Sequence, residues 1–127
     1  MKTYDIDYAQ SKFEYPVLDK IHGEPTYHAL KRMKEQLKRN AQSVISDLGG
    51  GAHGHLGLVL TAQEYTKFSQ IPYAAPRHPG PLQIPRNTDS AEAVRLREEH
   101  DETIRLFRES LDVEKALTRQ IVAALEP

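Results

Sequence analysis

The chain has 127 residues, a length that suits one domain built around one hydrophobic core. Its 17 lysines and arginines are balanced by 18 aspartates and glutamates, so the composition gives neither a global basic field that would attract nucleic acid nor an acidic tail. The absence of cysteine excludes disulfides, thiolate zinc sites and cysteine nucleophiles.

The sequence also carries no targeting signal that we can identify. The N-terminal stretch MKTYDIDYAQ lacks the apolar core of a signal peptide, and no apolar run approaches the length that spans a bilayer. We therefore expect a cytoplasmic or nuclear protein that is not secreted and has no membrane partner.

Residues 1–22 are expected to form an N-terminal arm. Apolar side chains alternate with polar ones in two short runs, and the second run predicts a short β element near residues 13–17, interrupted by Pro16 and therefore at an edge. An arm that orders only against a partner or a core is an equally good interpretation. The alternating residues are Tyr4, Ile6 and Tyr8, then Phe13, Tyr15 and Val17.

Residues 23–48 carry the first strong helical pattern. Gly23 and Pro25 mark a turn, and Thr26 is a suitable N-cap. Gly49–Gly51 are expected to end this helix, because glycine is common at helix C-termini. Its apolar stripe recurs every three or four residues at Leu30, Met33, Leu37, Ala41, Val44 and Leu48.

A short strand is predicted at residues 57–60, and Thr61 and Glu64 form a capping-box pattern for a short helix through Phe68. Residues 72–85 hold five prolines and are expected to be extended. This segment is either a flexible linker or a docked strap, and interleaved apolar residues favour the strap. Those residues are Ile71, Tyr73, Leu82 and Ile84.

Residues 89–126 form the second strong helical region, with Asp89 and Glu92 at its start. Glu114 falls inside the apolar stripe and Asp112 could cap a new helix, so we expect a break near residues 111–113. Because the stripe is still strong at Leu125, we expect this chain to be part of a longer one. The stripe comprises Leu96, His100, Thr103, Ile104, Phe107 and Leu111, continued by Leu117, Ile121 and Leu125.

The stretch GGGAHGHLG, residues 49–57, raises the question of a metal site. On a strand, His53 and His55 would point to the same face and could share a metal, with a third ligand from elsewhere. His-x-His alone is a weak motif. A phosphate-binding loop is disfavoured, because the stretch follows a helix and lacks the lysine of that motif. Glycines that end a helix, followed by histidines in a tight turn, fit better. The available third ligands are His22, His28, His78 and His100.

Five basic residues lie within residues 31–39 and face only one acid, Glu35. They could contact nucleic-acid phosphates. A solvated helix face is the more common meaning of such a run, and Glu35 is spaced to pair within it. The five are Lys31, Arg32, Lys34, Lys38 and Arg39.

No set of nucleophile, base and acid is evident, and the serines lack an elbow motif. We therefore do not expect an enzyme, a cofactor or a small-molecule substrate. A small metal-binding protein or enzyme that uses His53 and His55 is one alternative function. An adaptor that binds a partner through the proline-rich segment is another.

Residues 17–127 resemble the N-terminal part of Gag-like proteins from copia-type LTR retrotransposons. The resemblance is carried by IHGEPTYHALKRMKEQLKRNAQSVISDLGGGAHGHLGLVLTAQEY, by RHPGPL and by LFRESLDVEKALTRQIVAALEP. Gly23, Tyr27 and Leu30 stand where the family opens its first capsid helix, although Leu30 replaces the usual tryptophan. The glycine-histidine stretch and the proline-rich segment match only a subset of such proteins.

This resemblance implies a mainly α, capsid-like domain over residues 23–127 that associates with copies of itself into particles and packages RNA. The basic face at residues 31–39 would then face RNA or a neighbouring copy. The family's cysteine-rich RNA-binding knuckle is absent from this sequence. The core or interface residues expected on this basis are Leu30, Met33, Leu37, Leu96, Ile104, Phe107, Leu111, Leu117 and Ile121.

Overall fold

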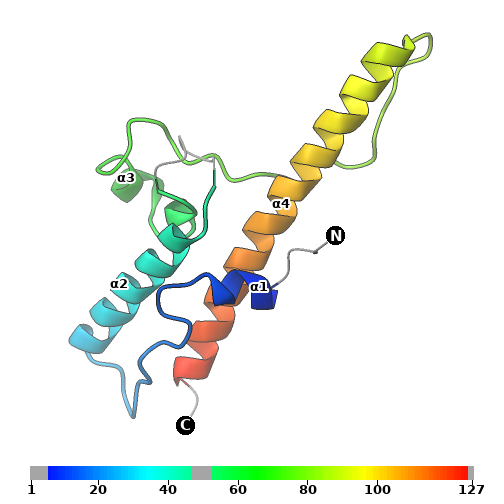
Figure 1. Cartoon of the computed structure of the whole chain (residues 1–127). Helices are drawn as coiled ribbons and strands as arrows, with labels where there is room; N and C mark the ends of the chain where they lie inside the picture. The colour runs from blue at the N-terminus through cyan, green and yellow to red at the C-terminus, as the bar shows by residue number, and fades with distance from the viewer. Residues whose placement is uncertain (1–5, 47–52, 126–127) are drawn as a thin grey trace.

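The computed structural model describes residues 6–46 and 53–125, and those residues are mainly helical, as predicted. Figure 1 shows a long helix, α4, with α1 and α2 beside its C-terminal half and its N-terminal half extending beyond them. The elements in chain order are α1 (Ile6–Ser11), α2 (Tyr27–Ser43), the 3-10 helix η2 (Leu56–Leu58), α3 (Ala62–Tyr65) and α4 (Ser90–Leu125).

Helix α2 begins as predicted and ends earlier than predicted. The Thr26 side chain accepts a hydrogen bond from the Ala29 amide at 3.1 Å, which caps the first turn. The helix ends at Ser43, and the returning chain satisfies one carbonyl of its last turn, because the His55 amide donates to the Ala41 carbonyl at 2.8 Å. The expected stop at Gly49–Gly51 lies outside the described residues.

The two predicted β elements are wrong. Residues 13–17 form an irregular segment, and the expected strand at 57–60 is replaced by the 3-10 helix η2 and a turn. Leu56 and Leu60 are both buried, with a spacing of four residues. A spacing of four residues places two side chains on one face of a helical turn or of a strand, so the pair is compatible with η2 and does not distinguish the two.

The predicted break near residues 111–113 is also wrong, since α4 runs without interruption for 36 residues. Only the C-terminal half of the helix contains fully buried residues. The predicted stripe holds partly buried residues in the N-terminal half. In the C-terminal half the buried residues lie on a face that is rotated from the predicted stripe, and Glu114 is exposed. The buried residues of α4 are Ser110, Val113, Ala116, Leu117, Gln120 and Ala124.

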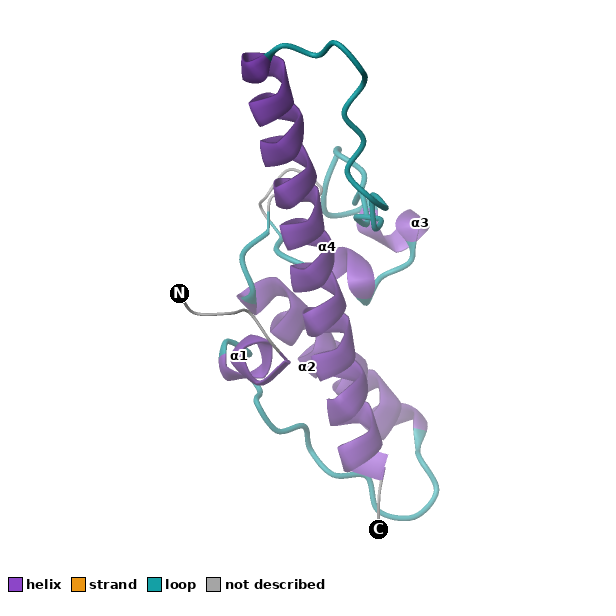
Figure 2. Ribbon diagram, turned by 90° about the vertical axis from the view of Figure 1, so that its right-hand side faces the viewer, coloured by secondary structure: helices purple, strands orange, loops and turns teal. Residues whose placement is uncertain are grey.

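The main core lies where residues 6–21, α2 and the C-terminal half of α4 meet. Apolar side chains from all three segments pack together, so the N-terminal arm supplies part of the core. Figure 2 shows α1 and α2 grouped around the lower half of α4. The buried members are Ala9, Phe13, Leu18, Met33, Leu37, Ala41, Val44, Val113, Ala116, Leu117 and Ala124.

A second, smaller cluster lies under η2 and α3. Leu56, Leu60 and Tyr65 are buried in it, with Tyr73 packed against them. The capping box predicted at Thr61 and Glu64 is confirmed, because each side chain binds the other's backbone amide at 3.1 Å. These contacts fix the chain between α2 and the proline-rich segment.

Candidate interaction surfaces

The two histidines of the GGGAHGHLG stretch bind different partners. His55 is fully buried, and its Nε2 lies 3.1 Å from Oε1 of Glu109 on α4. Because a carboxylate oxygen only accepts, Nε2 is the donor in that pair. His53 Nε2 lies instead 2.8 Å from the carbonyl oxygen of Phe68, to which it donates.

The surroundings of His55 give it a structural role. Its Nδ1 lies 3.5 Å from the Tyr73 hydroxyl, and Glu109 also accepts a hydrogen bond from Arg105 at 3.3 Å. Burial raises the pKa of the Tyr73 hydroxyl. This buried polar group connects η2 and the start of the proline-rich segment to α4.

The predicted shared metal face depended on a strand that the structure replaces with a turn and η2. Within residues 6–46 and 53–125, no group of three or more His, Asp or Glu side chains is arranged to hold a metal ion. Gly54 packs against the end of α2, where an added Cβ would lie 2.5 Å from the Val44 carbonyl oxygen. This close approach explains the need for glycine here without a ligand.

Four of the five basic residues at 31–39 form ion pairs with carboxylates. Lys34 lies 2.9 Å from Glu64, and Lys38 lies 3.2 Å from Glu35. Arg32 pairs with Asp19 and Arg39 with Glu14. Across the described part of the chain, Lys31 is the member of the set for which no carboxylate lies within ion-pair distance.

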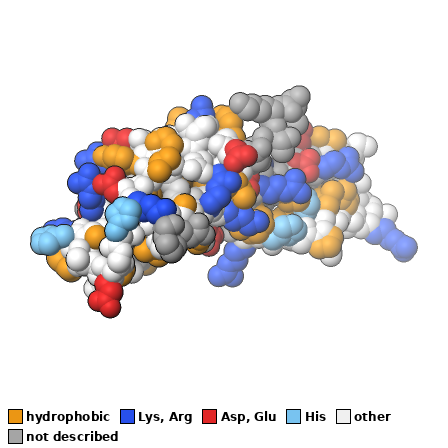
Figure 3. Space-filling model, turned by 90° about the horizontal axis from the view of Figure 1, so that it is seen from below, with side chains coloured by type: hydrophobic (Ala, Val, Ile, Leu, Met, Phe, Trp, Pro, Cys, Tyr) orange, Lys and Arg blue, Asp and Glu red, His pale blue; other side chains and the backbone are white. Residues whose placement is uncertain are grey.

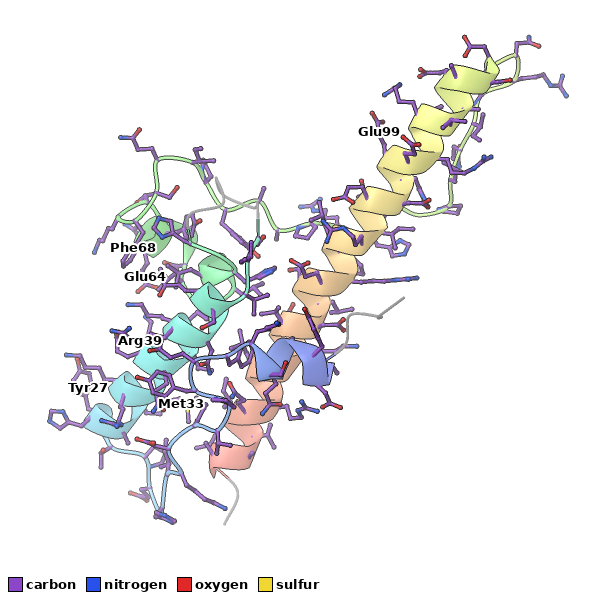
Figure 4. All side chains as sticks on the ribbon, viewed as in Figure 1. Tyr27, Met33, Arg39, Glu64, Phe68 and Glu99 are labelled. Carbon is purple, nitrogen blue, oxygen red and sulfur yellow. The ribbon has the colours of Figure 1, made fainter. Side chains whose placement is uncertain are left out.

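The pairing disperses the basic character that the sequence suggests. Figure 3 shows basic, acidic and apolar side chains intermixed on one face of the molecule, and Figure 4 shows Glu64 on α3 near the side of α2 that carries Arg39. Because most of these cations already have an anionic partner, one copy of the chain offers little free positive charge for phosphate.

The Lys34–Glu64 pair gives a prediction about pH. Hydrogen bonds from the Lys34 ammonium and the Thr61 amide lower the pKa of Glu64 from 4.5 to about 2. The interaction therefore stabilises the fold above the ordinary carboxyl pKa and is lost as the pH falls through about 2. Replacing Lys34 with methionine should raise the Glu64 pKa toward 4.5, as measured by NMR titration of the side-chain carboxyl. An unchanged pKa would show that Lys34 does not hold this carboxylate.

The N-terminal half of α4 is only partly covered by the rest of the fold. Between Ser90 and Glu109 it has no buried residue, although this stretch spans five turns. The Asp89 carboxylate caps it by accepting from the Glu92 amide at 2.8 Å. Figure 2 shows only the chain leading into α4 running alongside this half.

Charged pairs along this half satisfy one another within the helix. Arg95 bridges Glu92 and Glu99, and Arg105 bridges Glu102 at 2.7 Å and Glu109 at 3.3 Å. The guanidinium groups lower the pKa values of Glu92 and Glu102. Intrahelical pairs of this kind support a helix whose apolar face is only partly covered.

The proline-rich segment covers one side of the same half. The edge of the His78 ring meets the Phe107 ring at a centroid distance of 5.3 Å, and the His100 side chain donates to the Gly80 carbonyl at 2.7 Å. Residues 72–85 have no helix or strand. Ile71, Ile84 and Val94 remain exposed on this part of the molecule, which we call the projecting lobe, residues 71–109.

The predicted core or interface residues divide into three groups. Met33, Leu37 and Leu117 are buried in the main core, and Ile121 packs against it. Leu30 is 49% exposed and lies outside the main core, so its expected role at an interface stays a prediction. Four residues of α4 are partly exposed, which suits an interface better than a core: Leu96, Ile104, Phe107 and Leu111.

Sequence reasoning missed most of the arm's contribution. Phe13 and Leu18 are buried, and the polar residues Asn40 and Gln120 are buried between α2 and α4. The alternation around Phe13 was a usable signal for the arm. The two amides gave no such signal, because polar residues inside a helix usually mark the solvent side.

Two surface grooves flank the arm. One, of about 450 Å³, lies between Tyr8 and Lys12 of the arm, the end of α2 and Leu106 of α4. The other, of about 390 Å³, lies between Pro16 and Val17 of the arm and the last turns of α4. Neither gathers a catalytic set among the residues that line it.

No family model, curated protein or solved structure matches this chain. Among the helices of the described residues, none combines the length and apolarity that crossing a bilayer requires.

Proposed function

We propose that this chain is a helical assembly module that associates with copies of itself. The observation that carries the proposal is the projecting lobe. A helix of ordinary globular proteins buries one apolar face, and its stability comes mostly from that packing. The N-terminal half of α4 carries apolar residues from Val94 to Phe107, none of which is fully buried, and Val94 is 49% exposed.

The charge distribution supports a second copy as the partner. Arg95 and Arg105 are paired with four carboxylates of the same helix, which reduces the repulsion between two approaching lobes. The formal net charge of the whole chain is −1. A net charge close to zero favours association.

The resemblance to copia-type Gag capsid regions leads to the same kind of function, and in that setting the chain would be a structural protein rather than an enzyme. The resemblance also implies RNA packaging, and we propose this function for the assembled form only. There, Lys31 and its counterparts on neighbouring copies would repeat and their charges would add.

Two valines on α4 provide a matched test. Val94 is 49% exposed in the lobe, and Val122 is 52% exposed near the C-terminal end. Val94→Asp should weaken self-association about tenfold or more, because it places a charge within the proposed contact. Val122→Asp should leave association nearly unchanged. Sedimentation velocity over a concentration series measures both, and equal behaviour of the two variants would remove the lobe from the contact.

A further inference from the structure

We infer that the N-terminal arm, residues 6–21, can leave the groove of its own chain and fill the same groove in a second copy, so that arms are exchanged. This inference rests on the proposed self-association and adds an exchanged arm to the contact proposed for the lobe. The partner it names is a second copy of this chain, and the exchanged element is the arm.

Residues 14–19 of the arm are held in part through their backbone amides. Three α2 side chains, spaced four and three residues apart, accept hydrogen bonds from backbone amides between residues 14 and 19. Hydrogen bonds to backbone amides depend on the path of the bound segment, so the same segment of a second copy could form them equally well. The bonds join the Asp19 amide to Gln36 at 3.3 Å, the Tyr15 amide to Asn40 at 2.7 Å and the Glu14 amide to Ser43 at 3.1 Å.

Helix α4 completes this arrangement from the opposite side. Gln120 donates to the carbonyls of Tyr15 at 2.8 Å and Pro16 at 2.7 Å, and its own carbonyl oxygen accepts from Asn40 at 2.8 Å. Asn40 and Gln120 are both buried. Because buried amides are costly to leave unpaired, the groove between α2 and α4 requires an extended chain in this position.

Apolar side chains of the arm make the groove selective for this sequence. Ala9, Phe13 and Leu18 are buried against α2 and α4, spaced four and five residues apart along the arm. The groove therefore requires both an extended backbone at residues 14–19 and small and large apolar side chains in this order. An identical chain supplies both, which is why a second copy is the occupant we name.

The connection between the arm and α2 is suited to reopening. The last arm contact is the Ile21 amide, which donates to the Ala124 carbonyl at 2.9 Å. Residues 22–26 are then exposed and irregular, and Gly23 reverses the chain with a φ of 72°. Extending this hinge would carry the arm away while every groove contact could re-form in a neighbour, which makes exchange a low-cost route to association.

The absence of cysteine allows a direct experiment on the full chain. Glu14→Cys and Ser43→Cys place thiols at positions whose backbone amide and side chain are 3.1 Å apart. The two single variants are mixed, incubated at high concentration and treated with a short bis-maleimide linker. Exchange predicts a cross-linked heterodimer on a denaturing gel, well above the yield from mixing Glu24→Cys with Ser43→Cys.

The hinge gives a second readout with a matched control. Alanine at Gly23 strains the φ of 72°, so Gly23→Ala should raise the heterodimer yield roughly fivefold by disfavouring the closed hinge. Gly80 has a φ of 77° and equally open surroundings, but it lies in the proline-rich segment. Gly80→Ala should therefore leave the yield unchanged.

The outcomes separate this inference from the proposed function. If light scattering shows association while the mixed single variants give no more heterodimer than the control pair, arm exchange is overturned and association stands. If neither association nor the heterodimer appears, both fail. A heterodimer whose yield is equally raised by Gly23→Ala and Gly80→Ala would also overturn the role of the hinge.

Discussion

Replacing Phe13 with alanine is expected to lower the free energy of unfolding by about 3–5 kcal/mol, the usual cost of removing a buried phenylalanine. The Phe13 side chain is 4% exposed and packs with Ala9, Leu18 and residues of α2 and α4. In a domain of ordinary stability, this change would remove a large fraction of the total free energy of unfolding. Denaturant unfolding followed by circular dichroism measures the loss.

Phe107 provides the control for this prediction. It is partly exposed in the projecting lobe, where it meets the edge of His78. Phe107→Ala should therefore cost less than Phe13→Ala, about 1–2 kcal/mol, because its side chain is not fully buried and loses less transfer free energy. Similar losses from the two variants would contradict the division between the arm-containing core and the lobe.

Replacing Asn40 with leucine is expected to lower the free energy of unfolding by about 3 kcal/mol. The substitution nearly conserves volume, but it removes the partner of the Tyr15 amide and of the Gln120 carbonyl oxygen, in a site where Asn40 itself is fully buried. Each buried polar group left unpaired costs about 1–3 kcal/mol. The cost should appear in equilibrium unfolding as a lower denaturant midpoint.

Gln42 lies two residues further along α2 and is exposed, so Gln42→Leu should change stability by less than about 0.5 kcal/mol. A double-mutant cycle of Asn40 with Gln120 should give a coupling energy of about 0.5–3 kcal/mol. Additive effects of the two substitutions would mean that the amides do not act as one unit.

The helix starts could be predicted because they depend on neighbouring residues. Thr26 caps α2 and the Thr61–Glu64 box caps α3, each through bonds to amides three residues away. Such contacts can be predicted from the local sequence without knowing the fold. The predominantly helical class followed in the same way from apolar spacing.

The errors came from interactions between distant parts of the chain. The run at residues 57–60 is too short for its period to distinguish strand from helix, and packing beneath Tyr65 and Tyr73 decides it. The continuity of α4 depends on a change of neighbours, from the proline-rich segment to α1 and α2. The pairing of Lys34 with Glu64 had no local signal either, because the two residues lie 30 positions apart in sequence.

The central claim is that the unmodified chain associates with itself, and light scattering coupled to size-exclusion chromatography tests it most directly. Interfaces in assemblies can be small and weak, so the concentration range must extend well above that of a routine column run. The account predicts a mass that rises from monomer with concentration and is the same with and without chelator. A mass that stays at the monomer value throughout would contradict it, and a rise abolished by chelator would favour the metal-binding alternative at His53 and His55.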